Sequence, residues 1–401
     1  MVHSLPLITT LVGALTMAFI LGMIAHRLHL SNMVGYLLAG VLIGPFTPGF
    51  VADQPLAAEL AELGVILLMF GVGLHFSVKD LLSVKYIAIP GAILQIVLAT
   101  LLGAVAGKLF GWSWTTGLVF GLSLSTASTV VLLRALESKG LLVKREGQIA
   151  IGWLIVEDLV MVLALVLLPV LAHSADPDPS FNIWLQLAVT LGKVLAFILF
   201  MFVIGRRIIP WALERTAGTG SGELFTLAVL VIALGIAFGA VKLFGVSFAL
   251  GAFFAGVVLS GSELSHKAAN DTLPLRDAFA VLFFVSVGML FDPGILLREP
   301  LAVLLTVLII IAGKSLAAYG LVRLFGYSNS VALTISASLA QIGEFAFILA
   351  GLAVYLKLIP NEARDLVLAG AIVSIMLNPF LFNWLARYQQ KKTATPPEIA
   401  P

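Results

Sequence analysis

Two adjacent carboxylates, Glu157 and Asp158, interrupt an apolar run that extends from Ile149 to Ala172 without any other charge. Glu157 lies nine residues after Gln148, which is about 14 Å along a helix and close to the middle of a bilayer. A carboxylate facing lipid at that depth costs several kcal/mol, so the pair is expected to face protein or a water-filled cavity. Such a group can take up a proton or bind a cation. A buried, hydrogen-bonded pair that packs two helices together is the alternative.

Lys314 and Glu344 are two further ionisable residues within apolar runs. Lys314 follows Pro300 by fourteen residues with no charge between them, and a midplane ammonium needs a counter-charge. Asp158 or Glu157 would supply that charge, whereas a lysine whose stem reaches the membrane surface is the alternative. Glu344 lies in the run ISASLAQIGEFAFILAG and is the third intramembrane acid.

Small polar side chains are concentrated in two of these runs. The segment 121–133, GLSLSTASTVVLL, holds five hydroxyl residues within seven positions: Ser123, Ser125, Thr126, Ser128 and Thr129. Hydroxyl side chains can satisfy backbone groups that local unwinding sets free, which predicts a broken helix. Helix packing through small residues is the alternative for each of them. The run around Glu344 holds Ser336, Ser338, Gln341 and Gly343, and is the second predicted break.

The elements that must position these residues follow from composition. The chain has 401 residues, of which 60% are hydrophobic and 11% are charged, and this balance predicts a polytopic all-α membrane protein. Thirteen apolar runs are expected to cross the membrane. They cover roughly 5–26, 33–46, 56–75, 86–110, 115–137, 147–172, 183–205, 223–243, 246–261, 277–291, 300–323, 329–355 and 364–387.

The domain organisation is expected to be a membrane domain over residues 1–390 and a polar tail over 391–401. The first run lacks a small-residue cleavage site, so we expect a retained helix rather than a signal peptide. The absence of cysteine excludes disulfides and thiol chemistry.

Basic residues predict the orientation. With thirteen spans, one side of the membrane carries sixteen of the 23 lysines and arginines and the other side carries five, while Lys193 and Lys314 lie within spans. The positive-inside rule then puts the N-terminus outside the cytoplasm and the C-terminus inside it.

The two predicted breaks fall in the fifth and twelfth spans. An offset of seven means that these spans cross in opposite directions, as an inverted repeat requires. The carboxylate span follows the first break and the lysine span precedes the second. Broken helices that meet near the midplane beside buried charges are the architecture of a secondary transporter.

Several motifs resemble one transporter family. They are VGYLLAGVLIGPFTPGF (34–50), ELGVILLMFGVGLHFS (62–77), SLSTASTVVLLRALE (123–137), GWLIVEDLV (152–160), FFVSVGMLFDP (283–293), GKSLAA (313–318) and SLAQIGEFAFILA (338–350). Together they resemble the membrane domain of Kef-type monovalent cation/proton antiporters of the second cation/proton antiporter superfamily, in the YbaL/RosB branch. The resemblance covers essentially the whole chain.

This resemblance implies a homodimer in a bacterial cytoplasmic membrane that exchanges K⁺ or Na⁺ for protons. It implies that Asp158 binds the ion and accepts the proton, with Ser125 and Thr126 completing a monovalent-cation site. Lys314 would pair with that aspartate, and Glu344 would also compensate charge. Lipid is the expected environment, and we expect no cofactor, no enzymatic activity and no nucleic-acid partner.

The chain departs from the family pattern in two places. Glu157 occupies a position where many electroneutral members have Asn or Gln and electrogenic members have Asp. Kef-type proteins usually carry a soluble nucleotide-binding regulatory domain after the membrane part, and no G-x-G-x-x-G stretch after a strand occurs here. We expect that domain to be absent from this chain or supplied by another subunit.

Three other functions were compared with antiport. A channel needs a filter-like motif, and an intramembrane protease needs two facing aspartates or a Ser/His pair, neither of which the runs contain. A sodium-coupled solute symporter with the same inverted repeat remains the alternative. K⁺ is favoured over Na⁺ as the transported ion. Electroneutral exchange is favoured over electrogenic exchange, because adjacent buried carboxylates disfavour double ionisation and Lys314 can compensate only one of them.

Overall fold

The computed structural model of the chain describes residues 6–74, 78–137, 139–142, 144–173, 183–262 and 264–394. These residues form helices joined by turns and loops, and no strand occurs among them. In hydrocarbon each backbone N–H and C=O has to be satisfied within its own segment, so apolar runs of this length become helices. The predicted all-α membrane fold is confirmed.

Within the described ranges, nine helical stretches are long and apolar enough to cross a membrane, and three shorter apolar helices accompany them. Each of the thirteen predicted runs coincides with one helix or with helices in series. Of the expected polar tail, residues 391–394 continue the last helix, whereas 395–401 lie outside the described residues.

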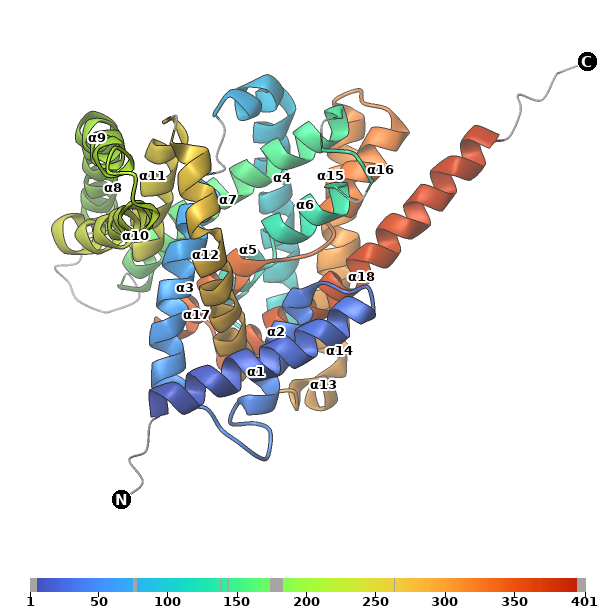
Figure 1. Cartoon of the computed structure of the whole chain (residues 1–401). Helices are drawn as coiled ribbons and strands as arrows, with labels where there is room; N and C mark the ends of the chain where they lie inside the picture. Colours follow the sequence, from blue (N-terminus) through green and yellow to red (C-terminus); the bar gives the residue numbers. More distant parts are fainter. Residues whose placement is uncertain are drawn as a thin grey trace, which may run out of the picture. The chain divides into compact units, whose positions relative to one another are not determined.

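The chain divides into two compact units, and unit 1 comprises Met1–Ile24, Gly35–Val78 and Val162–Phe291. Its helices are α1 (Pro6–Arg27), α2 (Asn32–Ile43), α3 (Gln54–Leu74), α8 (Ile183–Phe200), α9 (Arg206–Ala217), α10 (Gly222–Gly239), α11 (Phe248–Ser260) and α12 (Ser265–Met289). Helix α3 lies side by side with α12 (Figure 1) and also packs on α11. Helices α2 and α12 approach so closely that a side chain at Gly40 would overlap the Val285 carbonyl.

Unit 2 comprises Ala25–Val34, Lys79–Met161 and Asp292–Pro401, and contains every predicted site residue. Its helices are α4 (Val78–Leu109), α5 (Trp114–Ser123), α6 (Thr129–Glu137), α7 (Arg145–His173, which enters unit 1 after Met161), α13 (Ile295–Arg298), α14 (Pro300–Leu308), α15 (Lys314–Leu324), α16 (Asn329–Ser338), α17 (Glu344–Tyr355) and α18 (Asn361–Ala394). A core around fully buried Trp153 joins α4, α6, α7, α15 and α16.

Both predicted breaks are present in unit 2, and they share one plan. Helix α5 begins after the N-cap Ser113 and α16 begins after the N-cap Ser328, and each has ten residues. Non-helical segments of five residues follow, over 124–128 and 339–343, before α6 and α17 resume the span. Equal lengths and equal caps at an offset of seven spans are what an inverted repeat predicts.

Short π-helical segments interrupt three spans at Met201–Gly205, Ala240–Phe244 and Ile309–Gly313. The third lies between α14 and α15 and ends directly before Lys314. Because π segments insert residues into a helix, they rotate the side chains that follow, and they are frequent at functional sites.

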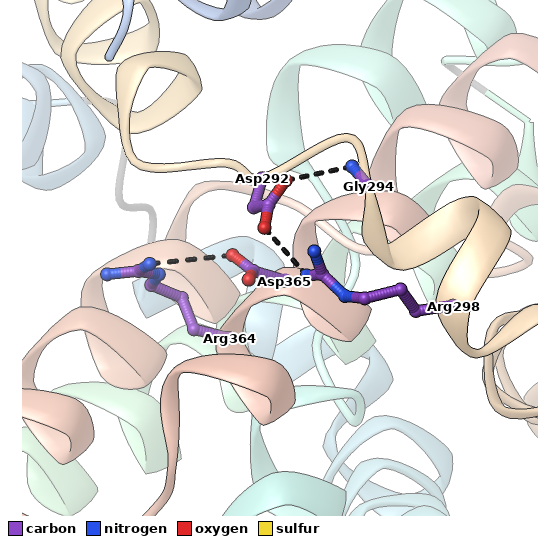
Figure 2. A network of polar contacts seen from close by, with 5 residues as sticks. All are labelled: Asp292, Gly294, Arg298, Arg364 and Asp365. Carbon is purple, nitrogen blue, oxygen red and sulfur yellow. Dashed lines mark hydrogen bonds and ion pairs between the residues drawn. The ribbon is translucent and has the colours of Figure 1, made fainter. Parts of the chain in front are cut away.

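A polar network outside the breaks holds the connection that enters unit 2 after α12 (Figure 2). Arg298 makes an ion pair of 2.6 Å with Asp292, which also accepts the Gly294 N–H at 2.8 Å. The hydrogen bond from Arg298 holds the pKa of Asp292 below its ordinary value. Beside them, Arg364 pairs with Asp365 at 3.4 Å near the start of α18. The two pairs lie where α13 packs on α18.

Candidate functional site

The two adjacent acids of α7 lie at the first break. Glu157 Oε2 accepts the Ala127 N–H at 2.8 Å, and Asp158 Oδ2 accepts the Thr129 hydroxyl at 3.2 Å. The two carboxylate residues are buried, at 0% and 3% exposure. Helix α6 begins at Thr129, and the N-terminus of a helix carries partial positive charge. Both acids therefore lie where the backbone attracts negative charge.

A buried amide from α4 forms a hydrogen bond to the unwound backbone of the first break. Gln95 Nε2 donates to the Ser125 carbonyl at 2.9 Å, and Trp153 Nε1 donates to Gln95 Oε1 at 2.8 Å. The Ser125 hydroxyl donates to the Leu122 carbonyl at 2.8 Å. The unwound backbone at Ser125 is thus satisfied by side chains rather than by helix continuation, while its hydroxyl oxygen keeps lone pairs for another ligand.

The second break is held by donors from the helices that flank it. The ammonium of buried Lys314 donates to the Gln341 carbonyl at 3.1 Å. The Ser315 hydroxyl donates to the Ser336 carbonyl at 3.2 Å, and Asn378 Nδ2 of α18 donates to the Ala337 carbonyl at 3.0 Å. These carbonyls belong to the C-terminal end of α16 and the break after it, where partial negative charge favours a cation.

The two breaks meet each other. The Ser128 N–H donates to Gln341 Oε1 at 2.8 Å, and Gln341 Nε2 donates back to the Ser128 carbonyl at 3.2 Å. A Cβ atom at Gly343 would lie 2.4 Å from Ser128 Cα, so this approach requires glycine. The pair of hydrogen bonds joins segments that are 213 residues apart in the sequence.

The structure brings all six predicted site residues into unit 2, and among the described residues no hydrogen bond or ion pair joins any two of them. Lys314 interacts electrostatically with Glu157, and among the described residues it forms no direct ion pair with either acid of α7. Its pairing with Asp158 stays a prediction. Glu344 is buried beside Ser128 as the first residue of α17, and neither of its carboxyl oxygens has a hydrogen-bond partner in the part of the chain that the structure describes.

Several oxygens at the first break have no protein partner in the part of the chain that the structure describes. They are Thr126 Oγ1, Glu157 Oε1 and Asp158 Oδ1, all buried. Carboxylate and hydroxyl oxygens in such a place suit a proton or a hard cation. No group of three or more His, Cys, Asp or Glu within the described ranges is arranged to hold a metal ion, so a cation here would rely on hydroxyl and carbonyl oxygens as well.

Sequence reasoning missed three contributors to this site. Gln95 is the one amide in the run 86–110, and an isolated amide in an apolar span was a signal that could have found it. Thr129 and Gln341 were recognised only as polar residues of the breaks. Their roles, as donor to Asp158 and as the link between breaks, depend on contacts that no spacing reveals.

Comparisons with known proteins agree with this architecture. A family model described as sodium/hydrogen exchanger, transmembrane, matches residues 14–388. The chain is 68% identical over 391 residues to Escherichia coli (strain K12) YbaL, which is named as a candidate cation/proton antiporter; the match covers 97% of this chain and 70% of that protein. It is 37% identical over 353 residues to a K(+) efflux antiporter 4 of Arabidopsis thaliana, covering 88% of this chain and 59% of that protein.

The solved structure of the sodium proton antiporter MjNhaP1 from Methanocaldococcus jannaschii at pH 8 shares the fold. Its TM-score is 0.69 at 16% sequence identity, over 95% of this chain and 98% of that one.

Proposed function

Because the chain belongs to the sodium/hydrogen exchanger family, we propose that it exchanges K⁺, in preference to Na⁺, for protons at the buried Asp158 carboxylate. Cation/proton antiport as such follows from the family and from the relatives. The ion is proposed as K⁺ because the Arabidopsis relative is named for K⁺ efflux. The observation that supports Asp158 is its geometry: one oxygen accepts the Thr129 hydroxyl, and the other has no described protein partner.

Exchange follows from competition at one carboxylate. A proton on Asp158 neutralises it, and a cation bound by Asp158, Thr126 and the Ser125 oxygens neutralises it equally well. A site that holds neither leaves a buried charge uncompensated, and this charge opposes movement of the site across the membrane. Only loaded forms then alternate between the two faces, which couples cation flow to proton flow.

Lys314 and Glu157 set the charge of the surroundings in this proposal. The Lys314 ammonium compensates negative charge in the cluster and at the C-terminal end of α16. Glu157 keeps its proton, because adjacent acids in a low dielectric oppose double ionisation. One proton then exchanges for one cation, and transport is electroneutral.

The setting is proposed from the sequence and the family. We place the chain in a bacterial cytoplasmic membrane as a homodimer, with the N-terminus outside and the C-terminus in the cytoplasm. The chain spans 70% of YbaL and 59% of the Arabidopsis relative, so a regulatory domain or subunit is a further proposal.

Proton movement in proteoliposomes tests the function. Vesicles loaded with an internal pH indicator receive pulses of Li⁺, Na⁺, K⁺ or Rb⁺ with no organic solute present. The proposal expects cation-driven proton efflux that is largest with K⁺. A sodium-coupled symporter would instead stay silent until an organic substrate is added, and that outcome would contradict antiport.

A further inference from the structure

Glu344 is the most isolated acid in unit 2. Both of its carboxyl oxygens are buried without a hydrogen-bond partner in the described part of the chain, and the residue is 1% exposed. Other buried acids of the cluster each have one oxygen that accepts a hydrogen bond, from Ala127 for Glu157 and from Thr129 for Asp158. Burial of an uncompensated carboxylate is costly, so Glu344 requires a compensating cation or proton.

The position of Glu344 is set by the contact between the two breaks. It directly follows Gly343, whose backbone lies against Ser128, and Gln341 is hydrogen bonded to Ser128 in both directions. These contacts hold the N-terminus of α17 beside the start of α6, which carries Thr129 and its bond to Asp158. Glu344 and Asp158 also interact electrostatically, with the same sign of charge.

Neither the helix end nor Lys314 accounts for this carboxylate. An acid in the first turn of a helix gains about 0.3–1 kcal/mol from the helix dipole, which is less than the several kcal/mol that burial of an unpaired charge costs. The Lys314 ammonium donates to the Gln341 carbonyl, and among the described residues no ion pair joins it to Glu344. The compensating charge is then either a proton on the carboxyl group or the transported cation, and the neighbouring buried oxygens of the first break that lack a described protein partner favour the cation.

We propose that Glu344 is a second carboxylate ligand of the transported monovalent cation, facing Asp158 where the two breaks meet. This inference rests on the proposed antiport function and replaces the charge-compensating role expected from the sequence. The cation is then held by oxygens from both repeats: Asp158 Oδ1 and Thr126 Oγ1 at the first break, and the Glu344 carboxylate at the second. Two carboxylates on one alkali cation make Glu344 a determinant of affinity and of ion selection.

Two variants distinguish a cation ligand from an acid that only begins a helix. Glu344→Gln keeps the shape and removes the charge, while Glu344→Asp keeps the charge and withdraws the oxygens by one methylene. Glu223→Gln, on the exposed first turn of α10 in unit 1, is the matched control. Proton efflux is measured against cation concentration, and cation-dependent thermal stabilisation of the purified protein gives a second readout that does not depend on transport.

A ligand role predicts distinct outcomes for the three variants. Glu344→Gln raises the half-saturating cation concentration by about tenfold or more, as loss of a charged contact implies, and weakens the thermal stabilisation by cations. Glu344→Asp continues to exchange but changes the order of preference among Li⁺, Na⁺, K⁺ and Rb⁺. Glu223→Gln behaves as the wild type in both assays.

The inference and the underlying function fail in different ways. A wild-type protein without cation-driven proton efflux contradicts the proposed function. If the wild type does exchange and Glu344→Gln has the same half-saturating cation concentration, only the ligand role of Glu344 is contradicted. If Glu344→Gln does not fold, an unchanged ion preference in Glu344→Asp overturns the inference in the same way.

Discussion

The two breaks of unit 2 share a backbone plan but differ in the charges around it. Each follows a ten-residue helix with a serine N-cap, and each has a carbonyl that accepts a donor from the preceding span. At the first break that donor is the neutral amide of Gln95, and two acids follow on α7. At the second break the donor is the Lys314 ammonium, and neutral Asn378 follows on α18.

The two repeats share a backbone plan, so their different charged side chains give each break a different electrostatic role. Two acids lie at the positive N-terminus of α6, the lysine lies at the negative end of α16, and a third acid, Glu344, begins α17 at the second break. Each of these charges offsets a half-helix dipole. The same backbone with neutral residues on both sides would hold its shape without binding an ion. The charged side chains, rather than the breaks alone, enable the site to bind an ion.

Lys314 should give the largest effect on stability, because it is the one cation of this cluster. Lys314→Ala leaves a buried acid without its partner, which for buried pairs costs about 3–5 kcal/mol. Chemical denaturation of the purified variant measures the loss.

Two double variants identify the acid that Lys314 compensates. The proposal keeps Glu157 neutral, so Lys314→Ala with Asp158→Asn should recover most of the stability, and Lys314→Ala with Glu157→Gln should recover less. The opposite order would show that Lys314 compensates an ionised Glu157, the acid with which it interacts electrostatically in the structure. Equal melting of all variants and the wild type would show that no such pairing exists.

The neutral donors test whether the two breaks are held equally. Gln95→Leu leaves the Ser125 carbonyl and the Trp153 N–H without their partner, at about 1–3 kcal/mol for each buried group. Asn378→Leu removes one donor from the Ala337 carbonyl, which still accepts the Ala340 N–H at 3.4 Å. We expect the first variant to be the less stable one in denaturant, and equal losses would argue that the second break depends on Asn378 as strongly.

Glu157 tests how many protons the first break exchanges for each cation. If Glu157 remains protonated, Glu157→Gln keeps exchange with little change in its response to voltage. Proteoliposomes with a membrane potential set by a permeant anion provide the assay. Potential-sensitive exchange in the wild type that disappears in the Gln variant would mean that Glu157 carries a second transported proton.

The polar network of Figure 2 includes no residue of either break. A substitution there should therefore have the smallest effect on stability and serves as the reference. Since Arg298 lowers the pKa of Asp292 in the folded protein, the pair stabilises the fold above the ordinary aspartate pKa of 3.8. This stabilisation is lost as the pH falls through the lower pKa of the folded state. Asp292→Asn should therefore lower the melting temperature slightly at neutral pH and less in strong acid, because exposed ion pairs contribute little. A loss that persists unchanged in acid would assign the effect to packing.

Much of the fold followed from the sequence because each step rested on local chemistry. Uninterrupted apolar runs became helices, and the hydroxyl cluster at 123–129 and the glycine at 343 marked the two breaks. The π segments were not predicted, since inserting a residue into an apolar helix leaves its composition unchanged. The segment before Lys314 nevertheless decides where that ammonium points.

The contacts of the site were less predictable than its members. Buried acids and a buried lysine are visible in the sequence because they are costly in a membrane. Which of them meet depends on how distant spans pack, as the Gln341–Ser128 link and the Gln95–Ser125 bond illustrate. The residues alone left Asp158 and Glu157 as possible partners of Lys314, and the family resemblance implied Asp158. The structure shows an electrostatic interaction of Lys314 with Glu157.

The most direct test of the account is cation-driven proton efflux by Asp158→Asn beside the wild type, in proteoliposomes of equal protein content. Asparagine keeps the shape of the side chain but cannot trade a proton for a cation. Melting curves of the purified proteins serve to confirm that the variant is folded. We predict a folded protein whose exchange falls below about a tenth of the wild-type rate with every alkali cation. Exchange near the wild-type rate in the folded variant would show that the coupling carboxylate lies elsewhere.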